Sequence, residues 1–396
     1  MKSFTMPQLS KRFLIVLAVL LLVGGIGVGA YGYQFVKGLG VTGLNNGASW
    51  GFYIAMFLFC EGMASGAMVM ATSGYVFHQD KLKPMALPCA VLSFIFMGLA
   101  GLYVTLDMGM PLHALYLMIS LNIVSPLAWD ILSLTSFLVI AGIFIYTLLK
   151  RKADSKLGIA AAHGAFIFAI AVPTVAAFIF ALQAGRHGWH SALMGPLFIA
   201  SGLDSGLALS ILALMGLNAT KIYSFPEKMY SFLAGILAMF VIVDAFMIFC
   251  ELVVMSYPAV PTDAHLLHEM TKGSMAPYFW TEMILGLAIP LVLLVFSKFR
   301  ANKGIVAFAS FAVIVGVFCK RMWLVLTSFL YPNVTGAPGL INGSAELGTG
   351  MDVWSVVSVY AVSPVEIAVG AGFIALGLAA YLLFAKLVFP RFSTDN

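Results

Sequence analysis

Ten apolar segments, each long enough to cross a membrane, dominate the chain. A transmembrane helix needs about 20 apolar residues to span a hydrocarbon core of about 30 Å. Hydrophobic residues make up 62% of the sequence and charged residues only 9%, which is too little polar surface to cover a soluble globule. We therefore predict an all-α polytopic membrane protein. The ten transmembrane helices are expected near residues 13–34, 48–77, 87–108, 127–149, 157–183, 195–217, 230–256, 277–298, 304–330 and 363–388.

The distribution of Lys and Arg predicts the orientation of these helices. Cytoplasmic loops of membrane proteins carry an excess of both residues. If the N-terminus is cytoplasmic, most of the 21 Lys and Arg lie on the cytoplasmic side, and only Lys37, Arg186 and Lys272 fall in outer loops. Both termini are therefore predicted to be cytoplasmic. The net charge of +5 follows from this asymmetry and gives no reason to expect a nucleic-acid partner, whereas membrane lipid surrounds the chain.

Two short motifs occur twice, in the same order. Residues 62–66 (GMASG) recur as 202–206 (GLDSG), and residues 126–130 (PLAWD) recur as 277–282 (PYFWTE). The repetition predicts two parallel copies of a four-helix unit, related by an axis along the membrane normal. The small residues of the first motif are also explained by close helix packing, whatever the function. The predicted units are residues 48–183 and 195–330, flanked by a transmembrane helix and outer loop at 1–47 and by an outer loop and transmembrane helix at 331–396.

Cysteine and histidine spacing argues against bound metal centres. The four cysteines lie singly in different spans, without the C-x-x-C spacing that iron-sulfur clusters use. A haem held by two histidines would need a pair at matching depth, and only His163 lies well inside a span. We predict that this chain binds no metal, haem or iron-sulfur cluster of its own.

Polar side chains gather at the predicted outer end of the first four-helix unit. A quinone head group needs hydrogen-bond partners for two oxygens, a proton donor or acceptor, and an apolar path for its tail. The outer residues can supply all three. The alternative is that the two aspartates cap helix ends and the tryptophans belong to an interfacial belt. The candidate quinone-binding residues are Trp50, Tyr53, Asp107, His113, Asn122, Ser125, Trp129 and Asp130.

Other ionisable residues are expected deeper in the membrane, where each costs at least ~2.5 kcal/mol. Glu61, Asp204 and Asp244 fall near the midplane, and His163 lies about two turns from the cytoplasmic side. Together they form a series of titratable groups, with gaps between them, that could carry protons. Structural carboxyl groups that are protonated or hydrogen-bonded explain them about as well.

Two adjacent cations, Lys320 and Arg321, are expected in the outer half of the ninth span. A guanidinium at that depth must find a carboxylate or ligand oxygens. Glu251 and Glu282 match its depth, and we predict that Glu251 and Arg321 form a structural ion pair. Like Asp107, Asp130 and Glu366, these glutamates are expected in the outer third of the membrane.

These motifs together resemble the NrfD and polysulfide-reductase membrane-subunit family over roughly residues 35 to 388. By length and helix count, the chain is similar to the ten-helix members found in uptake hydrogenases, alternative complex III and transmembrane complexes of sulfur metabolism. The resemblance is carried by Trp50-Gly51-x-Tyr53-Ile54-Ala55, Gly62-x-x-Ser65-Gly66, Asn122-x-x-Ser125-Pro126-x-x-Trp129-Asp130, Gly195-Pro196-Leu197-Phe198, Ser201-Gly202-x-x-Ser205-Gly206, Glu251 and Arg321.

The resemblance implies a haem-free subunit that reacts with quinone, of menaquinone type, in the cytoplasmic membrane of a bacterium or archaeon. It implies docking of a four-cluster ferredoxin-like iron-sulfur protein on the outer face, which exchanges electrons with a molybdopterin enzyme, hydrogenase or multihaem cytochrome. The family's head-group site lies on the outer side of the first unit; coupled proton translocation is left open. One departure is that Tyr53 and Phe57 stand where polysulfide-reductase-like members have polar residues that contact quinone.

Two other functions compete with this one. The first is an ion or solute transporter that uses Glu61, Asp204 and Asp244 as coupling sites. Transporters built from repeats commonly have helices interrupted by Gly or Pro at matching midplane positions. The two units of this chain lack such matched breaks, which argues against a transporter. The second is a purely structural membrane anchor, against which the outer polar residues argue.

Overall fold

The computed structural model describes residues 11–45, 48–186, 188–258, 260–330 and 360–392. The chain ends and residues 331–359, most of the outer loop predicted before the last helix, lie outside the described residues. Among the described residues, ten helical spans are long and apolar enough to cross a membrane, which confirms the predicted fold class. They are α1 (Lys11–Lys37), α2 (Phe52–Val76), α3 (Ala86–Asp107), α5 (Pro126–Leu149), α6 (Lys156–Ala181), α7 (Met194–Ala219), α8 (Glu227–Ser256), the continuous stretch α10 (Ala276–Thr281), η4 (Glu282–Ala288) and α11 (Ile289–Val295), α13 (Lys303–Thr327) and α14 (Pro364–Val388).

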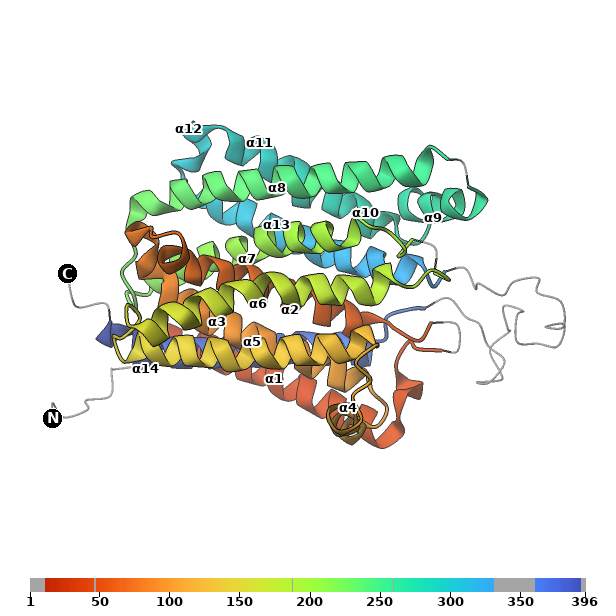
Figure 1. Ribbon diagram of the computed structural model, residues 1–396, viewed down its shortest axis with the longest axis horizontal. Coiled ribbons are helices and arrows are strands. Elements are labelled where there is room, and N and C mark those ends of the chain that lie inside the picture. The colour runs from red at the N-terminus through yellow and green to blue at the C-terminus, as the bar shows by residue number, and fades with distance from the viewer. Residues whose placement is uncertain (1–10, 46–47, 187, 259, 331–359, 393–396) are drawn as a thin grey trace, which may run out of the picture.

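Short helices connect the spans at the two ends of the bundle. In Figure 1, α1 begins and α14 ends at one end, where α12 also lies, whereas α4 and α9 lie at the opposite end. Following the orientation predicted from the charges, the end with α4 and α9 is called the outer end. The connecting elements are η1 (Leu39–Val41), η2 (Asp80–Met85), η3 (Pro111–His113), α4 (Ala114–Ile119), α9 (Pro261–Thr271) and α12 (Ser297–Arg300), and η5 (Phe389–Arg391) follows the last span.

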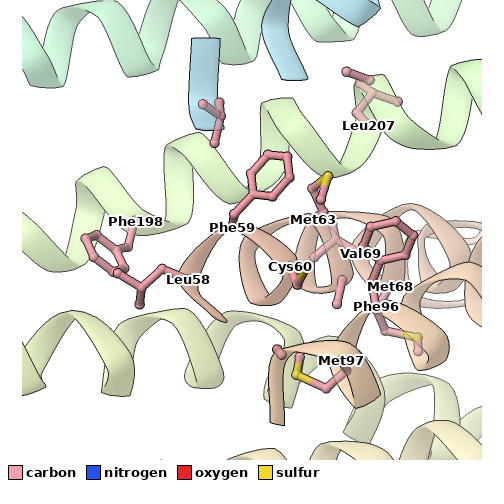
Figure 2. Packing of buried hydrophobic residues seen from close by; sticks show 14 of the residues in the cluster. Leu58, Phe59, Cys60, Met63, Met68, Val69, Phe96, Met97, Phe198 and Leu207 are labelled. Atoms are coloured by element: carbon pink, nitrogen blue, oxygen red, sulfur yellow. The ribbon is translucent and has the colours of Figure 1, made fainter. Parts of the chain in front are cut away.

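Helix α2 is the centre of the bundle. Within its most apolar 18 residues, 94% are buried, against 17% for α1. It packs against α3, α6, α7 and α13. Figure 2 shows part of this core, in which Leu58 of α2 lies beside Phe198 of α7; Phe96 of α3 belongs to the same buried cluster. Any polar residue on α2 is therefore held inside protein rather than against lipid.

Glycines bring the backbones of α2 and α7 into contact. A Cβ atom added to Gly66 would lie 2.1 Å from the carbonyl oxygen of Gly202, and one added to Gly206 would lie 2.4 Å from the Cα of Gly66. Such contacts are typical of small-residue seams between membrane helices. The two recurring glycine motifs thus pack against each other, which joins the first and second sets of helices.

The helices fall into two sets with the same order of neighbours. In the first, α2 packs on α3 and α6, and α5 packs on both; in the second, α7 packs on α8 and α13, and α11 packs on both. Helices α1 and α14 pack mainly on each other, and α14 also contacts α3. This arrangement is the one expected for two units at 48–183 and 195–330, although their duplication stays a prediction.

The eighth span contains a π-helical segment, η4, which the sequence pattern did not predict. Pro290 follows directly at the start of α11 and cannot donate a backbone hydrogen bond into the preceding turn. Within η4, Gly286 packs closely against the backbone of Gly316 in α13. The wider turn places Glu282 against α13, which matters for the buried charges described below.

Candidate functional site

One group of polar side chains lies at the outer ends of four helices. It consists of Gln34 (α1), Tyr53 (α2), Asp107 (α3), Glu366 (α14) and Tyr360, which lies just before α14, and we call it the outer cluster. The Tyr53 hydroxyl donates to Oε1 of Gln34 at 2.5 Å, and Nε2 of Gln34 donates to the Leu106 carbonyl at 3.1 Å. Tyr53 and Gln34 are buried. Gln34 therefore links the hydroxyl of Tyr53 to the outer end of α3.

Glu366 holds the other half of the outer cluster together. Its Oε1 accepts from the Tyr360 hydroxyl at 2.6 Å, and its Oε2 accepts from the backbone N–H groups of Gly43 and Ser363 at 2.9 and 2.8 Å. The Tyr360 oxygen in turn accepts from the N–H of Phe52 at 2.7 Å. Burial first, and then the nearby Glu366 carboxylate, raise the pKa of Tyr360, so its hydroxyl keeps its proton.

Asp107 is the member of the outer cluster with unused hydrogen-bonding capacity. Its Oδ1 is buried and has no hydrogen-bond partner among the described residues. It interacts electrostatically with Glu366, Tyr53 and Tyr360. A buried acceptor without a partner is costly in a finished fold, so a ligand hydrogen would satisfy it.

A second group of charges lies in the interior of the bundle. Lys320 (α13) contacts Asp244 (α8) at 2.5 Å and Glu282 (η4) at 3.8 Å, and all three side chains are buried. The indole N–H of Trp323 donates to the other Glu282 oxygen at 2.5 Å. The turn widened by η4 thus delivers Glu282 to the same cation that Asp244 binds.

Arg321, next along α13, extends this group toward α2. Its Nη2 donates to Ser201 Oγ at 2.9 Å, and its guanidinium lies 4.2 Å from the ring centroid of Phe198. Nε and Nη1 have no partner among the described residues. The carboxyl groups that interact with Arg321 electrostatically belong to Glu61, Asp244, Asp204 and Glu282, and Glu61 interacts with Asp130. We call Asp130, Glu61, Arg321, Asp204, Asp244, Lys320 and Glu282 the core network.

The core network has more carboxyl groups than cations. Five buried carboxyl groups face only two cations, Lys320 and Arg321. An ionised carboxylate without a matching charge is very costly in an apolar interior. Charge balance therefore leaves three of the five most stable in the form that carries a proton.

The structure divides the predicted quinone-binding residues among four places. Asp107 and Tyr53 come together in the outer cluster, whereas Asp130 turns inward to Glu61 in the core network. Trp50 stacks on Trp189 of the connection between α6 and α7, with ring centroids 5.6 Å apart. The remaining residues lie in the α3–α5 connection or at the start of α5: His113 and Asn122 are exposed, Ser125 precedes the first turn, and Trp129 donates to the Ile123 carbonyl.

Two other predicted contacts are not formed. Glu251 accepts a hydrogen bond from Ser191 Oγ at 2.7 Å and makes no ion pair with Arg321, because Arg321 faces the interior of the bundle toward α2 and α7. His163 does not join the core network. Its side chain is exposed on the surface of α6, with Nδ1 2.8 Å from the Ile159 carbonyl.

Sequence reasoning missed Gln34 and Tyr360 altogether, and it placed Glu366 at the right depth without assigning it a role. The Ser363-x-x-Glu366 spacing is a visible capping-box signal, and the structure contains that capping box. The same Glu366 oxygen also binds Gly43, 323 residues away. No sequence signal reveals that second role. The Lys320–Asp244 pair was likewise missed.

A family model described as polysulphide reductase, NrfD, matches residues 40–333, which is most of the chain. The chain belongs to the NrfD family. Relatives of this NrfD protein include a provisionally named dimethyl sulfoxide reductase membrane subunit from Halobacterium salinarum, 28% identical over 93% of this chain and 89% of the relative. The Hdr-like menaquinol oxidoreductase integral membrane subunit of Archaeoglobus fulgidus is 24% identical over 80% of both chains. The menaquinone reductase integral membrane subunit of Nitratidesulfovibrio vulgaris is 22% identical over 81% of this chain and 83% of its own length.

These relatives are membrane subunits of oxidoreductase complexes, which supports an oxidoreductase role for this NrfD protein in general terms. The matched region covers α2 to α13 and so includes the core network and Tyr53 and Asp107 of the outer cluster. Glu366 and Tyr360 lie beyond it, on or just before α14.

Proposed function

We propose that this NrfD protein is the haem-free, quinone-reactive membrane subunit of a respiratory oxidoreductase. It exchanges electrons between a menaquinone-type quinone and an iron-sulfur partner on the outer face. The names of two relatives support the quinone class, since one is a menaquinol oxidoreductase subunit and the other a menaquinone reductase subunit. A transporter is less well supported, because buried carboxyl groups are the one feature of the described residues that favours it.

The observation that carries the proposal is the buried, unpartnered oxygen of Asp107 beside Tyr53. Oxidation of a quinol releases two electrons and two protons, and reduction of a quinone consumes them. A carboxyl group within hydrogen-bond reach of a ring oxygen can accept or return one of those protons. Asp107 takes this role, while Tyr53 and its partner Gln34 form a wall of the head-group site. Trp50, Trp129, His113, Asn122 and Ser125 belong to the surrounding outer rim, and Asp130 passes protons on rather than touching the ring.

The iron-sulfur partner docks on the outer end, where α4 and α9 lie. We infer a four-cluster ferredoxin-like subunit, which relays electrons to or from a molybdopterin enzyme, a hydrogenase or a multihaem cytochrome. The relative named as a dimethyl sulfoxide reductase membrane subunit supports a multisubunit assembly of this kind. With both termini cytoplasmic, the head-group site would lie close to the partner, which shortens the electron-transfer distance.

Protons from the outer cluster exchange with the outer phase unless a route leads inward. The core network supplies groups for such a route, from Asp130 through Glu61 to Asp204 and Asp244. His163 is not part of it, because its side chain is exposed on α6. Glu61 lies about 14 Å from the outer end of α2 by helical rise. The network therefore reaches the middle of the membrane, and ordered water would complete the inner part.

The test is the substitution Asp107→Asn in the complete complex, which keeps the shape of the side chain and removes its proton chemistry. Quinone turnover should fall about 100-fold, the scale of a lost general base. Asp154→Asn is the matched control, because Asp154 lies exposed between α5 and α6 and should leave turnover unchanged. If Asp107→Asn keeps more than half of the turnover in a correctly assembled complex, the proposed site is wrong.

A further inference from the structure

An apolar groove lies between the first helix set, the second helix set and α14. Its volume is about 410 Å³, and it opens to the bundle surface. Phe52, Met56 and Phe59 form one wall along successive turns of α2, and Phe318 of α13 forms another, with its ring centroid 5.6 Å from that of Phe59. Ala371 of α14 lies on the third side. We call this space the tail groove.

The tail groove begins directly beside the outer cluster. Phe52, at its outer end, donates its backbone N–H to Tyr360, and Tyr360 donates to Glu366. The next residue of the chain, Tyr53, faces Gln34 on the other side of α2. Gly370, which also lines the groove, accepts a hydrogen bond from the buried Tyr103 through its carbonyl. Tyr360, which accepts from Phe52 and donates to Glu366, therefore joins the outer cluster to the outer end of the groove.

The dimensions of the groove fit a short length of branched chain. From Phe52 to Phe59 the wall of α2 runs for about 10 Å along the membrane normal, which is the length of about two isoprene units. The lining combines aromatic rings with the methionines Met56 and Met322. Methionine side chains are flexible and polarizable, so they adapt to the irregular outline of methyl branches.

We propose that the tail groove holds the first isoprene units of the quinone's prenyl tail while the head group lies at the outer cluster. This inference rests on the proposed function. The tail is already in an apolar medium when it lies in lipid, so the groove gains affinity through packing contacts rather than through the hydrophobic effect. Its main effect is to orient the head group toward Asp107.

The experiment measures binding of two probes to the full chain in phosphatidylglycerol nanodiscs, by quenching of tryptophan fluorescence at equal quinone-to-lipid ratios. Menadione has the ring without a tail, and menaquinone-2 adds two isoprene units. We expect menaquinone-2 to bind about tenfold more tightly to the unmodified chain. The substitution Ala371→Phe fills the groove and should abolish that tenfold difference while leaving the dissociation constant of menadione unchanged.

The matched control is Ala380→Phe, the same substitution at an exposed position of α14 that does not line the groove. It should preserve the tenfold difference. If Ala371→Phe also preserves it, the tail lies elsewhere and the inference is overturned, although the proposed function stands. If neither probe binds the unmodified chain, the proposed function fails together with the inference.

Discussion

At the scale of single residues, Lys320 and Asp244 form an ion pair in the interior of the bundle. Both side chains are fully buried, and Glu282 and Trp323 complete the surroundings. A buried pair is poor evidence of net stabilisation, because desolvation offsets the attraction. Removing one partner is strongly destabilising, because it leaves an uncompensated charge in an apolar interior.

We therefore predict that Lys320→Met destabilises the protein by about 3–5 kcal/mol. The double variant Lys320→Met with Asp244→Leu should recover much of that loss, because neither charge then remains unpaired. Thermal unfolding of the purified protein in detergent measures both. Lys303→Met is the control, since its pair with Glu227 is exposed and is worth at most about 1 kcal/mol. Equal damage from the single and double variants would show that Lys320 and Asp244 do not depend on each other.

At the scale of helices, the glycine seam between α2 and α7 sets how the two helix sets meet. The seam lies on the packed faces of α2 and α7, where Glu61 and Ser65 of α2 and Ser201 and Asp204 of α7 are also buried. A wider separation of α2 and α7 would move the core-network residues of the two helices apart. The seam therefore contributes to function through geometry, although no glycine takes part in chemistry.

Gly66→Ala should destabilise the protein by about 1–3 kcal/mol, because its Cβ would overlap the Gly202 carbonyl and the backbones cannot yield independently. The control is Gly98→Ala in α3, where a Cβ meets nothing within 4 Å. That change should be neutral or slightly stabilising, since alanine favours helix. The thermal unfolding midpoints of the two variants are compared. Similar midpoints for both would show that the glycine seam does not constrain the packing of α2 on α7.

At the scale of the whole molecule, the core network joins the two helix sets and reaches only from the outer end to the midplane. We predict that Glu61→Gln with Asp204→Asn keeps quinone turnover in the reconstituted complex and loses proton uptake from the inner side. Asp204 is the better target than Asp244, because neither of its oxygens has a partner among the described residues, whereas Asp244 holds Lys320. A pH-sensitive dye trapped inside the vesicles reports the uptake. Loss of turnover with an intact outer cluster would assign these residues to the redox site or to the fold.

The sequence predicted the ten spans because apolar length is visible in one dimension. It also predicted depth, which brought Asp107 and Tyr53 to the same level. Depth does not give the direction in which a helical residue points, so Asp130 was grouped with Asp107 although it faces Glu61. Nor does it give which helices are neighbours. Gln34 and Glu366 lie at opposite ends of the chain, and only the packing of α1 and α14 beside α3 brings them to Asp107.

The most direct test of the proposed quinone site is to locate a bound quinone on the complete complex. A photoreactive menaquinone analogue, activated in native membranes and mapped by mass spectrometry, would label residues beside its head group. We predict labelled peptides from the outer ends of α2 and α3 and from the start of α14, with labelling suppressed by excess unmodified menaquinone. Suppressible labelling confined to α7, α8 and α13 would place the head group in the second helix set and contradict the assignment of the outer cluster.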